Sequence, residues 1–201
     1  MQVLTIPQAD ALRLSEKQED HFYDRKAAAI SGEKMQKVAV AFANADGGEI
    51  YVGIADNSDQ PDPSKRWRGA QLIEDYNQHI QALTEIQPAL PMEVSFLKST
   101  DSDGYVLRVQ IEKSQSVHKT TDGTVYERKG AQSLPIKDHA RVTALSFAKG
   151  AASFEDSSVD SAVAEDIVDA PALAEFLSDY SPKTDPLDLA LNKNLVDRKT
   201  F

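Results

Sequence analysis

Apolar residues recur along this chain at two spacings, which predict helices and strands within one domain. Residues 31–45 carry apolar side chains at helical spacing, and Ser31 is placed to cap the first turn of that helix. The members of this stripe are Met35, Val38, Ala39 and Phe42. Residues 49–54 alternate instead, which predicts a strand inside a sheet. Its expected faces are Ile50, Val52 and Ile54 on one side and Tyr51 and Gly53 on the other.

The same two spacings divide the rest of the chain. We expect further helices over residues 1–14, 70–86, 134–149, 171–180 and 185–196, and further strands over residues 16–26, 92–97, 105–111 and 124–127. The first of these strands should be half-exposed, because its aromatic residues lie among charges. The Asp103-Gly104 pair is a strong hairpin signal, so the two strands around it should be antiparallel neighbours. Residues 60–69 contain two prolines and are expected to form a loop.

The sharpest corner is expected between the helix of residues 31–45 and the strand that follows it. Gly47 and Gly48 supply positive-φ conformations that other residues avoid, so we interpret them, with Asn44, as structural turn residues. A phosphate-binding loop for ATP requires a strand before its glycines and a helix after them, followed by Lys and Ser or Thr. The order here is helix, turn and strand, and no Lys follows. An ATPase is therefore not expected.

Charge is distributed unevenly along the 201 residues, whose formal net charge is −10. Residues 151–201 hold eleven acidic and four basic residues, a net of −7, whereas residues 1–150 hold twenty-one and eighteen, a net of −3. The acidity thus belongs mostly to the tail, and it does not exclude a polyanionic partner for the first part. We expect a domain over residues 1–150, an acidic linker over 151–170, and the helical start of a further region over 171–201.

We expect a cytoplasmic protein from the distribution of apolar and basic residues. No apolar run approaches the roughly 18 residues of a membrane span, and the N-terminus lacks a basic start followed by an apolar core, so no membrane contact is expected. The chain contains no cysteine, which excludes disulfides and thiolate metal sites. It ends without a terminating pattern, so we expect it to be part of a longer protein.

Four segments in this order resemble the Schlafen AlbA-type domain of bacterial regulators and vertebrate Schlafen proteins. These segments are EDHFYDRK, VAVAFANADGGEIYVGIAD, VLRVQIEKS and VHKTTDGTVYERKGAQS. The resemblance covers roughly residues 16–150. It implies an α/β fold with a mixed, largely antiparallel sheet flanked by helices, and a role in binding nucleic acid, usually DNA in bacterial members. The segment PLDLALNKNLVDRKTF is similar to the opening of the winged-helix region that commonly follows this domain.

The resemblance also implies a candidate nuclease site. Vertebrate Schlafens that cleave tRNA use three carboxylates, and the matching positions here are Glu19, Asp24 and Asp56. Such a site would hold Mg²⁺ or Mn²⁺, which favour oxygen ligands, and would activate water against a phosphodiester. The pattern departs from the family at two points. Asp24 replaces the usual Glu, and Ala55 replaces the first member of an acidic pair. The competing interpretation is that all three are strand-edge or turn charges.

Two basic sets are candidates for contacts to nucleic acid. The first is Lys65, Arg66, Trp67 and Arg68, which suits phosphate contacts and base stacking by the only tryptophan. The second is His118, Lys119, Arg128 and Lys129, which flanks the Asp122-Gly123 turn where the resemblance leads us to expect a positive motif. The alternative for the first set is a solvated loop in which Trp67 caps the core.

Three classes of function remain open on the sequence alone. The leading hypothesis is a module that binds DNA or RNA within a bacterial regulator, either as a monomer or as a homo-oligomer. The second is a metal-dependent endoribonuclease that uses Glu19, Asp24 and Asp56. The third is a protein-interaction scaffold, in which the acidic tail binds a basic partner or folds over the basic loops.

Overall fold

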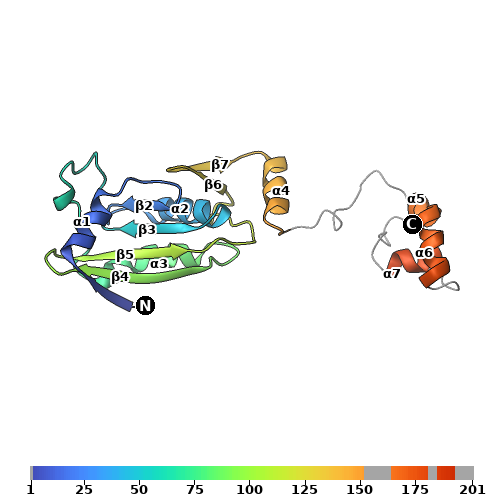
Figure 1. Ribbon diagram of the computed structural model, residues 1–201, viewed down its shortest axis with the longest axis horizontal. Coiled ribbons are helices and arrows are strands. Elements are labelled where there is room, and N and C mark those ends of the chain that lie inside the picture. The colour runs from blue at the N-terminus through green and yellow to red at the C-terminus, as the bar shows by residue number, and fades with distance from the viewer. Residues whose placement is uncertain (1, 152–163, 181–184, 193–201) are drawn as a thin grey trace. The chain divides into compact units, whose positions relative to one another are not determined.

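A computed structural model describes residues 2–151, 164–180 and 185–192. The chain divides into two units, residues 1–154 and 155–201 (Figure 1). The first unit is built on a five-stranded sheet in the order β1-β4-β5-β3-β2, beside a separate hairpin of β6 (Val125–Lys129) and β7 (Gln132–Ile136). The strands of the five-stranded sheet are β1 (Gln2–Ile6), β2 (Tyr23–Lys26), β3 (Gly48–Val52), β4 (Met92–Ser99) and β5 (Tyr105–Ile111).

The sheet is mixed, which confirms the expected fold class. Its centre is antiparallel, because β5 pairs with both β4 and β3 in that sense, and the β4-β5 pairing confirms the predicted hairpin. Each outer strand pairs in parallel with its neighbour, β1 with β4 and β2 with β3. Parallel neighbours require a crossover, which α2 (Gly32–Asn44) supplies between β2 and β3.

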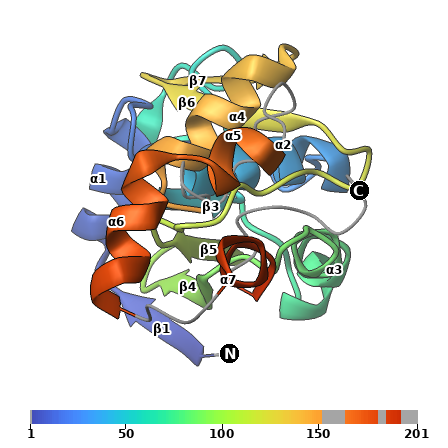
Figure 2. The ribbon, with the colours of Figure 1, turned by 90° about the vertical axis from the view of Figure 1, so that its right-hand side faces the viewer.

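Helices cover both faces of the sheet, as Figure 2 shows in the view along the strands. On one face, α2 and α3 (Asn77–Thr84) pack over a core that includes Phe42, Ile50 and Leu107, all fully buried. On the other face, α1 (Gln8–Glu16) closes a smaller core with Tyr23, Tyr51 and Trp67. Burial on both faces explains why β2 is hidden rather than half-exposed, which corrects the sequence-based expectation.

The corner between α2 and β3 has the predicted form. Gly47 has φ 82° and Gly48 has φ 153°, and the Gly47 amide donates to the Phe42 carbonyl at 2.9 Å. A β-carbon on Gly47 would lie 2.6 Å from the Ile111 carbonyl oxygen, and one on Gly48 would lie 2.6 Å from the Phe42 ring. The glycines are therefore needed for close packing as well as for the turn.

Asn44 holds the β6-β7 hairpin to helix α2. Its Nδ2 donates to the carbonyls of His118 and Tyr126, each at 2.9 Å, and its Oδ1 accepts from the His118 amide at 2.8 Å. All three bonds join α2 to the segment that leads into β6 (Val125–Lys129) and to β6 itself. Asn44 is thus a structural residue that acts across the fold as well as at the turn.

Four element predictions are corrected. The helix predicted over residues 1–14 is confirmed only in its second half, because the chain opens with strand β1 and α1 begins at Gln8. Residues 70–86 form a short 3-10 turn, Ile73–Tyr76, before α3, and so do not make one long helix. Residues 132–136 form β7 (Gln132–Ile136), and α4 begins only at His139 and ends at Ala148.

Ile54 packs with Tyr51 and Trp67 on the opposite face from Ile50, because the positive φ of Gly53, 115°, interrupts the alternation.

The second unit contains three helices among its described residues, α5 (Ala164–Val168), α6 (Pro171–Tyr180) and α7 (Pro186–Asn192). α5 lies inside the range predicted to be linker, and the end of the predicted helix over 185–196 falls outside the described residues. Leu177 and Leu189 are the large apolar side chains buried here. Within the described ranges, no helix combines the length and the hydrophobicity needed to cross a membrane.

Candidate functional site

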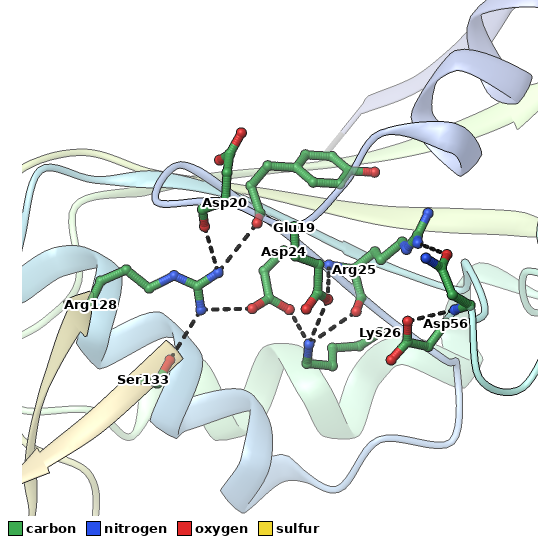
Figure 3. Close-up of polar contacts among 10 residues, drawn as sticks. Glu19, Asp20, Asp24, Arg25, Lys26, Asp56, Arg128 and Ser133 are labelled. Atoms are coloured by element: carbon green, nitrogen blue, oxygen red, sulfur yellow. Dashed lines mark hydrogen bonds and ion pairs between the residues drawn. The ribbon is translucent and has the colours of Figure 1, made fainter. Parts of the chain in front are cut away.

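Asp24 lies at the centre of a charged network at the edge of the main sheet (Figure 3). Its side chain is only 2% exposed, and its Oδ2 accepts a hydrogen bond from Nη1 of Arg128 at 2.8 Å. Its other oxygen forms an ion pair with the Lys26 ammonium. Burial raises the pKa of Asp24, and the two cations oppose that rise. Each oxygen of the carboxylate is therefore already matched by a positive group from the protein.

Lys26 joins Asp24 to Glu19. Its Nζ donates to Glu19 Oε1 at 3.0 Å and to the Arg25 carbonyl at 3.0 Å, beside the ion pair with Asp24. Burial alone would lower the pKa of Lys26. The carboxylates of Asp24 and Glu19 have the larger, opposite effect, so the pKa of Lys26 lies above its ordinary value. The ammonium thus stays charged and supplies the cation between these two carboxylates.

Asp56 does not join this group. It is exposed in the turn after β3, where its Oδ1 accepts from the Asn57 amide at 2.5 Å. The link to the network is indirect, because Arg25 donates to the Asn57 side chain (Figure 3). Among the described residues, no group of three or more His, Asp or Glu side chains is arranged to hold a metal ion. The three predicted ligands are not brought together, and their donor atoms do not fit Mg²⁺ or Mn²⁺ as placed.

Arg128, which the sequence predicts to contact phosphate, is buried beside Asp24. Its side chain is 1% exposed, and its guanidinium lies 4.6 Å from the centre of the Phe42 ring. Besides Asp24 it donates to the carbonyls of Asp20, at 2.8 Å, and Tyr23, at 3.3 Å. Arg128 therefore fastens β6 to the edge of β2 and is not available to a ligand.

Arg66 and Trp67 are also buried, at 5% and 7% exposure. The Arg66 guanidinium donates to the carbonyls of Gln60, Pro61 and Ser15 at 2.6 to 2.9 Å. Trp67 packs in the core beneath α1, so the predicted base stacking is replaced by the capping alternative. Arg66 and Trp67 therefore stabilise the loop of residues 60–69 through buried hydrogen bonds and packing.

His118 is the fourth buried member of the predicted sets, at 1% exposure. Its Nδ1 bonds to the Pro88 carbonyl at 2.8 Å, and burial lowers its pKa, so the ring is held neutral. The structure thus encloses the imidazole that the sequence predicts to contact nucleic acid.

The remaining four basic residues are exposed. Lys65 pairs with Asp62 at 3.3 Å, and Lys129 pairs with Glu127 at 3.6 Å, both at the surface. The side chains of Arg68 and Lys119 have no hydrogen bond or ion pair within the part of the chain that the structure describes. These residues extend from the loop around the 3-10 turn Pro63–Lys65 and from the segment around β6, and they stay candidates for contacts to nucleic acid.

An open groove lies beside the second basic set, between the β6-β7 hairpin and α4. Its volume is about 600 Å³, and Lys119 lines it together with Lys137 and His139. The sequence reasoning missed the last two, because it placed residues 134–149 in one helix. Pro135 was the sequence signal that could have separated strand β7 from helix α4, because proline lacks a backbone donor and is disfavoured inside a helix.

The comparison with protein families agrees with the resemblance seen in the sequence. The family described as Schlafen, AlbA_2 matches residues 19–137, which is more than half of the chain. A comparison with curated proteins gives no match. Among solved structures, the DIP2311 protein from Corynebacterium diphtheriae is similar at 19% identity and a TM-score of 0.48; the alignment covers 96% of this chain and 42% of that one. The match over residues 19–137 shows that this chain belongs to the Schlafen AlbA_2 family.

Proposed function

We propose that this domain binds nucleic acid, as a module of a cytoplasmic bacterial regulator, by contacting phosphates with its exposed basic side chains. The observation that carries the proposal is the division of the basic sets by burial. Arg66 and Arg128 stabilise the fold, whereas the cations of Arg68 and Lys119 are exposed and have no internal partner among the described residues. Exposed cations without an internal partner suit contacts to the phosphates of nucleic acid.

Burial of the main carboxylate favours binding over cleavage. A hydrolytic metal requires carboxylate oxygens that are free to coordinate it. The oxygens of Asp24 are engaged by Arg128 and Lys26, and Asp56 lies outside that network. The nuclease is therefore the second candidate. The observation in its favour is that Glu19 and Asp24, two of its three proposed carboxylates, lie close enough to share Lys26.

Fluorescence anisotropy with labelled single-stranded DNA, duplex DNA and RNA tests the proposal. We expect two double variants, Lys65→Ala with Arg68→Ala and Lys119→Ala with Lys129→Ala, to weaken binding and to lower its salt dependence. Removal of two cations that contact phosphates of a single strand should reduce the slope of log K against log[salt] by about 1.4. A matched control, Lys34→Ala with Lys113→Ala, also removes two exposed charges and should change both quantities less.

The same samples, incubated with Mn²⁺ and with a chelator, separate the two candidates. Intact oligonucleotide in both samples, together with a retarded complex, supports the binding module. Shortened RNA that appears only with Mn²⁺ would support the nuclease instead. Absence of any complex with all three probes would refute the proposed function.

A further inference from the structure

The groove between the β6-β7 hairpin and α4 combines positive charge with apolar walls. Three basic side chains, from the segment before β6, the end of β7 and the start of α4, line it: Lys119, Lys137 and His139. Apolar surface comes from Tyr126, Pro135 and Val142. Its volume of about 600 Å³ lies within the range of about 300 to 1,000 Å³ usual for small-molecule sites.

The basic side chains of the groove are available to a ligand. Lys119, Lys137 and His139 are all exposed, and no ion pair or side-chain hydrogen bond engages them within the described ranges. This sets them apart from Lys65 and Lys129, each of which has a carboxylate partner at the surface. Two ammonium groups and an imidazole that meet in one concave site suit a phosphate group.

The rest of the lining argues against a purely phosphate-binding groove. Tyr126, Pro135 and Val142 offer apolar contact, which a phosphate does not use and a nucleobase does. Asp122 also lines the groove, and its Oδ1 is fixed by the Thr120 hydroxyl at 2.5 Å and the Thr124 amide at 3.0 Å. A carboxylate there repels a second phosphate and accepts hydrogen bonds from the N–H groups of a base.

We propose that this groove binds an unpaired nucleotide, so that the domain prefers single-stranded nucleic acid to a duplex. The inference rests on the proposed function and names its substrate class. The phosphate lies against Lys119, Lys137 and His139, and the base enters between the hairpin and α4. In a duplex the bases are stacked and paired, so only the phosphates reach the groove and its apolar walls make no contact with a base.

The test compares a fluorescein-labelled single strand of about 12 nucleotides with a duplex of the same sequence. Val142→Trp fills the groove without changing charge, and Lys119→Ala with Lys137→Ala removes its two lysines. We expect each variant to bind the single strand about tenfold more weakly, which is the size of the effect of removing one base or phosphate interaction. Duplex binding should change about twofold or less in Val142→Trp, since its phosphates do not use the apolar walls.

Arg13→Ala with Lys98→Ala is the matched control, because it removes two exposed charges from α1 and β4. It should leave the ratio of single-strand to duplex affinity unchanged. Equal affinity of the native chain for both probes, an unchanged ratio in Val142→Trp, or an unchanged single-strand affinity in the lysine pair variant would refute the nucleotide groove and leave the proposed function standing. Absence of binding to either probe would refute both. If Val142→Trp does not fold, the native chain's preference for the single strand and the loss of single-strand affinity in the lysine pair variant decide together.

Discussion

Asp24 and Arg128 form an ion pair whose side chains are 2% and 1% exposed. Taking such charges out of water is costly, and the pair is stable only while both members and their hydrogen bonds are present. Asp24 also contacts Lys26, and Arg128 also bonds to two backbone carbonyls, so each charge has more than one partner. These residues therefore contribute to the domain mainly by joining β2 to β6.

Loss of either member leaves a buried charge without its partner, so the costs of the two losses should not add. We expect Arg128→Ala to lower the free energy of unfolding by about 3 to 5 kcal/mol, because it leaves a buried carboxylate with one cation fewer. The double variant Asp24→Leu with Arg128→Met should lose less than the sum of the two single changes. Urea unfolding measures all of these values. A loss of under about 1 kcal/mol in Arg128→Ala would show that the pair is not structural.

This pair also limits how Asp24→Ala is interpreted. The variant removes the partner of a buried guanidinium, so a loss of cleavage or binding would report damage to the fold unless unfolding is measured alongside. Asp56→Ala is the cleaner probe of a nuclease, because Asp56 is exposed and its side chain, among the described residues, bonds only to the neighbouring Asn57 amide.

His118 should make stability depend on pH. Burial lowers its folded pKa below the ordinary 6.5, so the unfolded chain takes up a proton at a pH where the native chain does not. Stability is then full above about pH 6.5 and falls as the pH drops towards the folded value. We expect His118→Asn, which keeps a donor for the Pro88 carbonyl, to lose stability less steeply between about pH 7.5 and 5.5. Parallel curves of unfolding free energy against pH would contradict this.

At the scale of elements, patterns with a local cause were predictable. The helix α2, the glycine corner and the hairpin of β4 and β5 follow from spacing and turn residues that lie within the segments themselves. The errors have tertiary causes. β1 exists because β4 offers it a parallel partner, and β2 is buried because α1 and β6 cover it, neither of which a local pattern contains. β7 was not predicted, because the apolar residues of segment 134–149 also suit a single helix.

Two glycines with the same φ allow the cost of backbone strain to be separated from the cost of lost packing. Gly47 and Gly123 both have φ 82°, but an added β-carbon would meet backbone atoms of the Ile111 region at Gly47 and nothing within 4 Å at Gly123. We expect Gly123→Ala to cost about 1 kcal/mol, and Gly47→Ala to cost about 2 kcal/mol or more in addition. Thermal or urea unfolding of the two variants gives the comparison. Equal losses would show that the corner is not closely packed.

At the scale of the whole molecule, the net charge of −10 conceals a first part that is close to balance, at −3 over residues 1–150. The sequence identified which residue types could contact phosphates, but not which of them are exposed. Four of the predicted contact residues are buried: Arg66, Trp67, His118 and Arg128. The other four are exposed: Lys65, Arg68, Lys119 and Lys129. The groove residue Lys137 was missed because its position depends on where β7 ends.

The salt dependence of oligonucleotide binding tests the central claim most directly. If four exposed cations contact phosphates of a single strand, a plot of log K against log[salt] for the native chain should be linear with a slope of about −3. Removing Lys65 and Arg68 together should make the slope shallower by about 1.4, with the fold intact by urea unfolding. Binding that does not weaken with salt, or no binding at low salt, would contradict the account.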